Sequence, residues 1–443
     1  MGEADREQRK LPTAGEVFYH LRASATAVTS AATTATPSTG SMARFVRRLV
    51  HRAAHGLASC RGRLSNDGRM RVLLLTHFDP RGLGTIRENI ATLRQQSRHR
   101  FEICNLFKLF PRRTPLRLPD WISLRPYDAV FIHCTLSYNP DDLLRIDKHH
   151  REKLADYRGV TILMKQDETF RVAGLQSWLS HVPVSLILTC LRPADVPLIY
   201  PPSLCPETAF LHTLTGYVSP AMRRLADGTT GDRPIDIGYR GSRQPYSFGR
   251  LCHEKWHIGE VFGRICRERG LQHDISSRPE DRHFGNAWYR FLRRCKATLG
   301  VESGASIFDF DGSLEHKCEQ YLAEHPDADF ETVHRLYLAP HENNIRYAQI
   351  SPRHFEASAC RTLQIMYEGE YSGIFTAGRH YLSLRRDLSN LDDVLAAFAD
   401  ERTRQRITDA AVEEIVMNDR FSYRTFVQCL DDAIESCPRA KNR

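Results

Sequence analysis

Residues 350–381 constrain the fold most, because they predict a loop, a helix, a strand and a glycine-bearing loop in that order. Ser351 and Pro352 are typical of a helix start, since a hydroxyl caps free amides and proline is tolerated in the first turn. The apolar run at 363–367 predicts a buried parallel strand. Polar and small residues follow at the carboxyl end of that strand, where open α/β sheets bind ligands: Glu368, Gly369, Glu370, Ser372 and Gly373.

The helix start carries the motif Ser351-Pro352-Arg353-His354-Phe355-Glu356-Ala357. This stretch resembles the donor-binding segment of GT-B-fold glycosyltransferases, in particular the group-1 and CgeB-like (spore-maturation-type) members. The resemblance implies that Glu356 holds the ribose of a nucleotide sugar. It also implies donor contacts from Arg353 and from the loop with Glu370, Ser372 and Gly373. Two positions depart from the family pattern: Ala348 stands where many group-1 members carry another Glu, and Arg361 replaces a glycine.

A second match to this family lies at residues 235–242, where a short predicted strand runs into a Gly-Tyr-Arg-Gly turn. The resemblance implies that Arg240 faces the donor diphosphate, with Arg243 or Lys255 as the second cation. A diphosphate leaving group needs positive charge where its negative charge develops, and Arg and Lys supply it without a metal. Glu302 follows another predicted strand at 297–301, which suits ligand contact. We expect no metal site and no cofactor beyond the sugar nucleotide.

Residues 70–226 alternate apolar runs with helical patterns, which predicts a parallel, doubly wound sheet. The first run, 71–76, ends at His77, and a loop containing Gly82 and Gly84 follows it. Four polar residues at strand ends are candidates for a general base: His77, Asp79, His133 and Asp167. We favour Asp167, with His77 second, and a retaining enzyme would need no such base.

These patterns predict two facing Rossmann-like domains, the GT-B architecture, joined by a linker at 227–234. The first domain covers 70–226 and would bind the acceptor. The second covers 235–400 and would bind the donor. Helices at 401–443 would return to the first domain, with Phe421, Phe426 and Leu430 as anchors. Residues 1–69 form a leader that is predicted to be disordered up to about residue 41.

Charge is unevenly distributed along the chain. Eleven of the Arg and Lys and five of the Asp and Glu lie in residues 1–69, so +6 of the formal +9 lies there and +3 lies in the rest. A nearly balanced body argues against a nucleic-acid partner. Residues 43–58 place apolar side chains on one helical face and basic ones on the other, which suits an anionic membrane surface.

Cysteine usage and hydropathy indicate a cytoplasmic protein. The twelve Cys include no Cys-x-x-Cys pair, which favours free thiols over disulfides or zinc. No apolar run reaches the roughly 18 residues of a spanning helix, and no apolar segment of a secretory signal follows Met1. We expect peripheral attachment at the inner face of the membrane if the 43–58 helix is used.

The function that these observations predict is sugar transfer from a nucleotide diphosphate sugar to a hydroxyl of a glycan or lipid-linked acceptor, in surface polysaccharide or glycoconjugate synthesis. Two alternatives stay open. A nucleotide-sugar epimerase shares the fold and needs acid and base groups at the sugar itself. A non-catalytic sugar-nucleotide-binding or membrane-adaptor protein would keep Glu356 and the amphipathic helix without chemistry.

Overall fold

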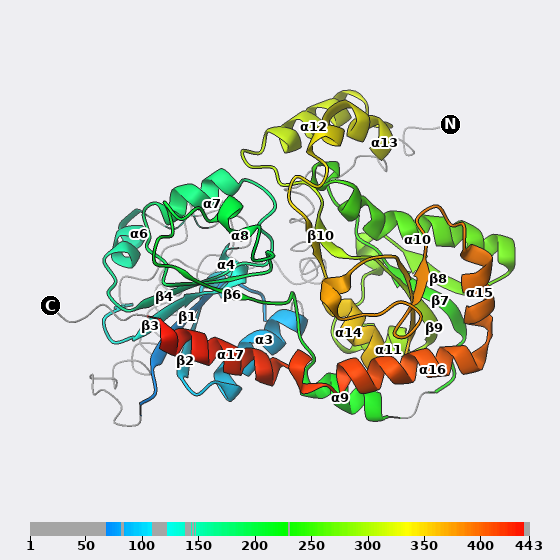
Figure 1. Cartoon of the computed structure of the whole chain (residues 1–443), viewed down its shortest axis with the longest axis horizontal. Helices are drawn as coiled ribbons and strands as arrows, with labels where there is room; N and C mark the ends of the chain where they lie inside the picture. The colour runs from blue at the N-terminus through cyan, green and yellow to red at the C-terminus, as the bar shows by residue number, and fades with distance from the viewer. Residues whose placement is uncertain are drawn as a thin grey trace, which may run out of the picture.

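Two parallel β-sheets organise the computed structural model of the chain (Figure 1). The structure describes residues 68–80, 84–108, 122–137, 143, 146, 148–228 and 231–437. The amphipathic helix predicted at 43–58 and part of the glycine loop, residues 81–83, lie outside them. Within the described residues, every helix is too short or too polar to span a bilayer.

The first sheet has the order β2-β1-β3-β4-β5-β6, with every neighbouring pair parallel. Its central strands are apolar and buried at every position, as a sheet covered on both faces requires. The strands are β1 (Arg71–Thr76), β2 (Arg100–Asn105), β3 (Ala129–Ile132), β4 (Val160–Met164), β5 (Leu186–Thr189) and β6 (Ala209–His212). Helices α3 (Gly84–Gln96), α4 (Cys134–Ser137), α6 (Lys148–Ala155), α7 (Val172–Leu179) and α8 (Val196–Ile199) lie around it.

The second sheet has the order β13-β12-β9-β7-β8 and is also parallel. Its strands are β7 (Ile235–Arg240), β8 (His273–Ser276), β9 (Cys295–Gly300), β12 (Leu363–Tyr367) and β13 (Leu382–Leu384). Its helices are α9 (Pro220–Asp227), α10 (Arg250–Arg269), α11 (Asn286–Arg293), α14 (Pro352–Ala359), α15 (Leu391–Ala399) and α16 (Glu401–Ala411). The predicted fold class, two facing Rossmann-like domains, is confirmed (Figure 1).

A segment between β9 and α14 projects from the second domain. It contains α12 (Ser313–Glu324) and α13 (Phe330–Val333), flanked by the short antiparallel strands β10 (Ser303–Ala305) and β11 (Tyr347–Gln349). Neither strand was predicted from the sequence. Its apolar side chains, including Leu314, Phe330 and Leu338, form a small core of their own with Tyr246 and Trp256.

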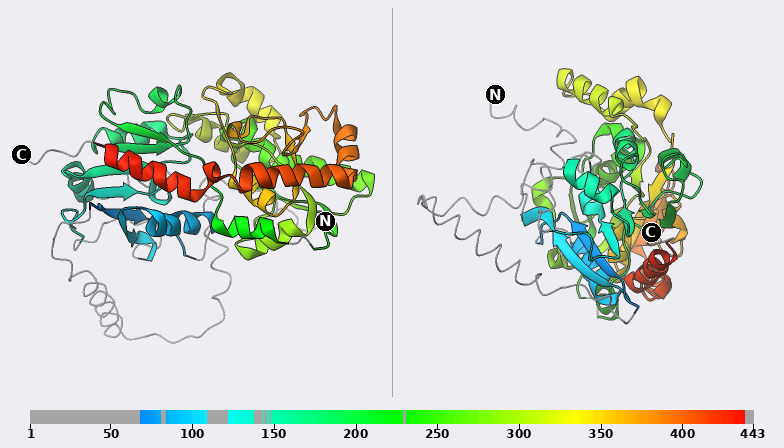
Figure 2. Two further views of the ribbon diagram at one scale, coloured as in Figure 1. Left: turned by 60° about the horizontal axis from the view of Figure 1, so that its bottom comes forward. Right: turned by 90° about the vertical axis from the view of Figure 1, so that its left-hand side faces the viewer.

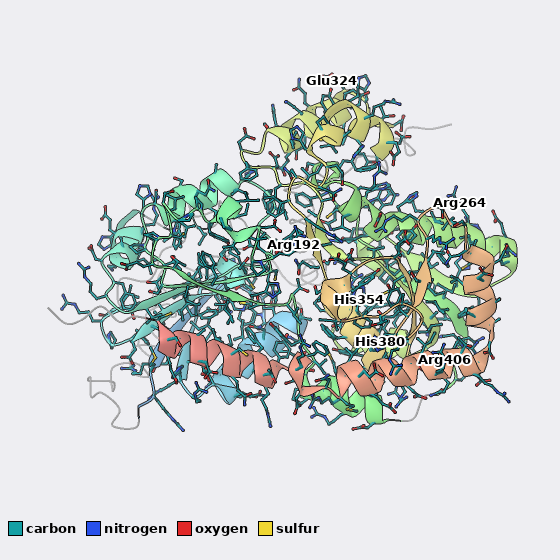
Figure 3. All side chains as sticks on the ribbon, viewed as in Figure 1. Arg192, Arg264, Glu324, His354, His380 and Arg406 are labelled. Atoms are coloured by element: carbon teal, nitrogen blue, oxygen red, sulfur yellow. The ribbon has the colours of Figure 1, made fainter. Side chains whose placement is uncertain are left out.

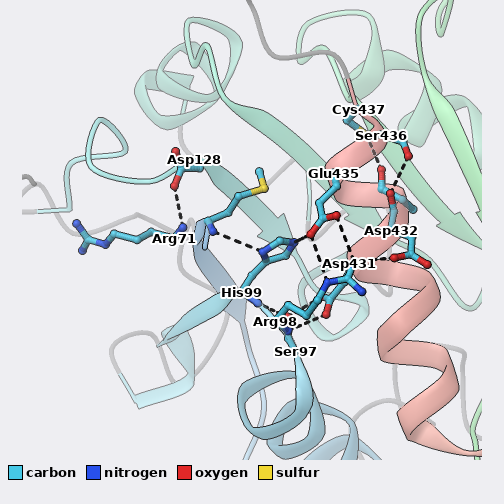
Figure 4. Close-up of polar contacts among 12 residues, drawn as sticks. Arg71, Ser97, Arg98, His99, Asp128, Asp431, Asp432, Glu435, Ser436 and Cys437 are labelled. Atoms are coloured by element: carbon cyan, nitrogen blue, oxygen red, sulfur yellow. Dashed lines mark hydrogen bonds and ion pairs between the residues drawn. The ribbon is translucent and has the colours of Figure 1, made fainter. Parts of the chain in front are cut away.

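The last helix, α17 (Tyr423–Ser436), continues past α16 and lies over the first sheet (Figure 2). Phe426 and Leu430 are buried in the core of that sheet, and the Phe426 ring stacks on Tyr217 with centroids 4.7 Å apart. Asp431 is buried and accepts hydrogen bonds from the Ser97 hydroxyl at 2.6 Å and the Arg98 amide at 2.8 Å (Figure 4). The helix is therefore held by apolar contacts and by a satisfied buried carboxylate.

Candidate active site

A pocket of about 210 Å³ opens in the second domain at the carboxyl ends of β7 and β9. Strand order reverses between these two strands, and such a reversal leaves a crevice that binds ligands in open α/β sheets. The start of α14 closes one side, so the amide end of that helix adds positive potential. The polar residues that line the pocket include Ser242, Lys255, Ser303, Ser351, Arg353 and His354.

Two cations reach this pocket. Lys255 Nζ donates to the Gly304 carbonyl at 3.0 Å and contacts Cys252 Sγ at 3.6 Å. Arg353 Nη1 donates to the Arg240 carbonyl, and its guanidinium lies 5.4 Å from the centre of the Trp288 ring. Neither cation forms an ion pair with a carboxylate of the described residues. Two cations thus line the pocket without a carboxylate of the described residues at ion-pair distance, which suits an anionic ligand.

His354 fixes the start of α14 (Figure 3). Ser351 N donates to His354 Nδ1 at 3.2 Å, and the Ser351 hydroxyl accepts from the Arg353 amide at 3.4 Å. Burial lowers the pKa of His354 to about 3, so the ring is neutral at physiological pH. The pocket's charge therefore comes from Lys255 and Arg353, and His354 aims the helix that carries Arg353.

Glu356 lies on the next turn of α14 and is buried. Its Oε2 accepts the Trp288 indole N–H at 2.7 Å. Its Oε1 accepts no hydrogen bond from the described residues. This oxygen is nevertheless not a fully buried atom without a partner. Burial raises the pKa of the carboxyl, and the Trp288 bond and the nearby Arg353 charge oppose that rise. Glu356 itself does not line the pocket; it is bonded to Trp288, which does.

Trp288 belongs to α11 and was not predicted as a site residue. Its ring faces Arg353, its N–H holds Glu356, and it lines the pocket. Nothing in the sequence indicates this role, because α11 and α14 are brought together only by the order of the strands between them. Phe291 supports the indole, with ring centroids 5.6 Å apart.

Arg240 lies at the end of β7, but its side chain is used inside the protein. Nε donates to the Asp281 carbonyl at 2.8 Å, and Nη1 donates to the carbonyls of Tyr239 and Asp274 at 2.9 and 2.8 Å. Nη2 contacts His283 at 3.2 Å and the Asp274 carboxylate at 2.8 Å. With all five N–H groups engaged and the side chain absent from the pocket lining, this geometry favours a structural role over the predicted diphosphate contact.

The loop after β12 is shaped by Glu302, which follows β9. Glu302 Oε1 accepts from the amides of Glu370 at 3.0 Å and Tyr371 at 2.8 Å. Tyr371, Ser372 and Gly373 all have positive φ, at 45°, 55° and 70°. Left-handed backbone at two non-glycine residues is strained, and the Glu302 carboxylate offsets that strain.

The other predicted residues of this loop also have partners within the protein. The Ser372 hydroxyl accepts the Ile350 amide at 3.0 Å, and Glu370 pairs with Arg346 at 2.9 Å. Glu302 and Ser372 therefore act on the loop's conformation. The Glu370 side chain is exposed and does not line the pocket.

The base candidates lie at the carboxyl edge of the first sheet. Asp167 follows β4 and is half-buried. Burial raises the pKa of the Cys252 thiol and the Asp167 charge adds to that rise, which places this carboxylate near the start of α10 in the other domain. His133 is buried and bonded to Asn89 at 3.2 Å, and burial lowers its pKa to about 3.

His77 follows β1, with its ring 5.5 Å from the Phe107 ring centroid. Its amide donates to the Thr135 hydroxyl at 3.2 Å. The charge of Asp167 acts on the Cys252 thiol of the second domain, and Cys252 contacts the pocket residue Lys255. Of the two base candidates, Asp167 therefore has the better-supported position.

No family model and no curated protein sequence matches the chain. Among solved structures, HepE of Anabaena in complex with UDP is similar over 83% of this chain and 100% of that one, at 11% identity and a TM-score of 0.47. An α-glucosyltransferase in complex with UDP and a 13-mer DNA covers the same shares at 8% identity and 0.46. TarM covers 70% of this chain and 55% of its own, at 8% and 0.42. Likenesses this remote carry no substrate or mechanism to this chain.

Proposed function

We propose that the chain is a glycosyltransferase that moves a sugar from a nucleotide diphosphate sugar to a hydroxyl acceptor. The observation that carries the proposal is the pocket between β7 and β9, where Lys255 and Arg353 form no ion pair with a carboxylate of the described residues and where Trp288, a lining residue, holds Glu356. A nucleotide diphosphate sugar offers both complements: phosphate oxygens for the cations and vicinal ribose hydroxyls for the carboxylate.

Each residue then has a definite task in the transfer. Arg353 and Lys255 stabilise the negative charge that develops on the diphosphate as the glycosidic bond breaks. Because these two side chains supply that charge, we propose that transfer needs no metal. Glu356 accepts hydrogen bonds from the ribose, and Trp288 holds it in place. Asp167, from the facing domain, takes the acceptor proton if the configuration inverts.

The test is incubation of the full chain with labelled nucleotide diphosphate sugars, preceded by a thermal-shift screen, since a ligand that binds only the folded state raises the melting temperature. Release of free nucleotide with a glycosylated acceptor supports the proposal. An epimerised donor, or binding with no turnover, would instead identify an epimerase or a binding protein. Activity lost in EDTA and restored by a divalent ion would refute metal independence.

A matched pair of lysine variants makes the assay specific to the pocket. Lys255→Gln removes a pocket cation, so donor binding should weaken. Lys296→Gln removes a lysine of β9 that is paired with Asp236 at 2.7 Å and does not line the pocket, so donor binding should be unchanged. Equal losses in the two variants would place the diphosphate elsewhere.

We further propose a glycan or lipid-linked acceptor, as in surface polysaccharide or glycoconjugate synthesis, and attachment of residues 43–58 to anionic membrane. These residues lie outside the described part of the chain, so the support is their basic, amphipathic sequence. The full chain should float with anionic liposomes in a salt-sensitive way, and a chain starting at Met70 should not. If neither chain floats, the acceptor need not lie at a membrane.

A further inference from the structure

The segment that projects from the second domain also enters the core of the first. Phe308, Ile345 and Tyr347 come from this segment and are buried. They belong to the same apolar cluster as Leu163 of β4 and Ile187 of β5. Domains within a chain usually move relative to one another unless the interface between them is large and hydrophobic. Here the second domain contributes side chains directly to the first domain's core.

Main-chain hydrogen bonds also join the projecting segment to the first domain. Asp309 N donates to the Thr169 carbonyl at 2.8 Å, and Arg171 N donates to the Asp309 carbonyl at 2.6 Å. Ala173 N donates to the Phe310 carbonyl at 2.8 Å. Residues 169–173 begin directly after the turn that follows β4, so the projecting segment is bonded to the stretch next to Asp167.

Tyr347 reaches the turn itself. Its hydroxyl lies within hydrogen-bonding distance of the Gln166 carbonyl and 3.0 Å from Glu168 Oε2, so its partners are the two residues that flank Asp167. Glu168 is buried, and its Oε1 accepts from Thr189 at 2.5 Å and Tyr200 at 2.7 Å. A buried polar network whose members all have partners is rigid, and this one includes a residue from the opposite domain.

We infer that Tyr347 is a positioning residue that ties the second domain to the turn after β4 and so sets the distance between Asp167 and the nucleotide pocket. The tie follows from the contacts alone, and its effect on turnover rests on the proposed function. The spacing between Asp167 and the nucleotide pocket is then set before a ligand binds. Misplacement of Asp167 would therefore lower the rate of the chemical step without weakening donor binding.

The chain offers a matched control for this inference. Tyr200 and Tyr347 are both fully buried and both donate toward the Glu168 carboxylate, but Tyr200 belongs to the first domain. Tyr347→Phe and Tyr200→Phe each remove one hydroxyl and keep the ring. Only Tyr347→Phe removes a bond between domains. Thr215→Val is a second interdomain variant, since the Thr215 hydroxyl donates to the Ile350 carbonyl at 2.6 Å.

The experiment compares amide hydrogen exchange in the full-length variants. Tyr347→Phe should raise the exchange rates of the Asp309, Arg171 and Ala173 amides about five-fold, the effect of losing about one hydrogen bond, and Tyr200→Phe should leave them within about two-fold. With a donor and acceptor in hand, Tyr347→Phe should lower kcat about ten-fold or more while the donor Kd stays within about two-fold.

Two outcomes would overturn the tie. The first is equal exchange rates at these amides in the two tyrosine variants, and the second is unchanged exchange rates in both Tyr347→Phe and Thr215→Val. An unchanged kcat in Tyr347→Phe would overturn the positioning role. A chain that shows the exchange difference but transfers no sugar would keep the tie and refute only the proposed function.

Discussion

Both sheets reverse strand order at one point, between β1 and β3 in the first domain and between β7 and β9 in the second. Their carboxyl edges nevertheless differ in how charge is treated. In the first, buried Lys165 donates to the Ser137 carbonyl and buried Glu168 accepts from hydroxyls on two sides. In the second, Lys255 and Arg353 form no ion pair with a carboxylate of the described residues. The reversal of strand order leaves a crevice at both edges. Whether the charged side chains already have partners then determines which edge attracts an anion.

The largest expected effect separates a structural arginine from a ligand-binding one. Arg240→Gln should lower the free energy of unfolding by about 2 kcal/mol, because it leaves carbonyls without donors, while the ion pair with the half-exposed Asp274 carboxylate adds little. Denaturant unfolding measures this loss. If Arg240→Gln folds with normal stability and instead loses donor binding, the diphosphate role predicted from the sequence is right after all.

Arg353→Gln should weaken donor binding and leave the free energy of unfolding nearly unchanged. It removes a pocket cation that makes no ion pair within the described part of the chain, so stability should change little while donor binding weakens by about 1.5–3 kcal/mol, the value of a hydrogen bond to a charged group. Calorimetry with a nucleoside diphosphate reports the affinity. Arg353→Lys is the control: it keeps the charge and loses the planar fork, so a partial recovery is expected. Unchanged affinity in Arg353→Gln would remove the pocket from the proposal.

Glu356→Gln sharpens the comparison through pH. Burial raises the pKa of this carboxyl in the folded protein, so the ionised form costs stability once the pH exceeds the unfolded-state value. The variant should therefore be at least as stable as the parent at neutral pH, yet bind donor more weakly by about 1.5 kcal/mol. Parent affinity should fall as the pH drops through the raised pKa, and the variant should not show this fall. Superimposable pH profiles would argue against a ribose contact.

Trp288→Phe should have the smallest effect. The ring survives, but Glu356 loses the 2.7 Å bond that orients it, so donor affinity should fall by about 1 kcal/mol. A double-mutant cycle with Glu356→Gln measures the coupling between the two residues. Additive losses would mean that Trp288 acts independently of Glu356.

Several features could be read from the sequence because they are local. The apolar runs at β1 and β12 have the predicted bounds, since buried parallel strands are apolar at nearly every position. Ser351 caps α14 as expected of a hydroxyl before Pro352. The strands β6, β10, β11 and β13 were missed, because they have three or four residues and β6 is largely exposed.

The sequence by itself therefore determined the two-domain α/β class, the helix that carries Arg353 and Glu356, and the polar turn that carries Asp167. Tertiary structure alone decided how these residues are used. Arg240 turns toward β8, Trp288 reaches Glu356 from another helix, and Tyr347 bonds the turn of the opposite domain. These contacts join residues 34 to 179 positions apart, so they depend on strand order and domain packing, which leave no periodic trace in the sequence.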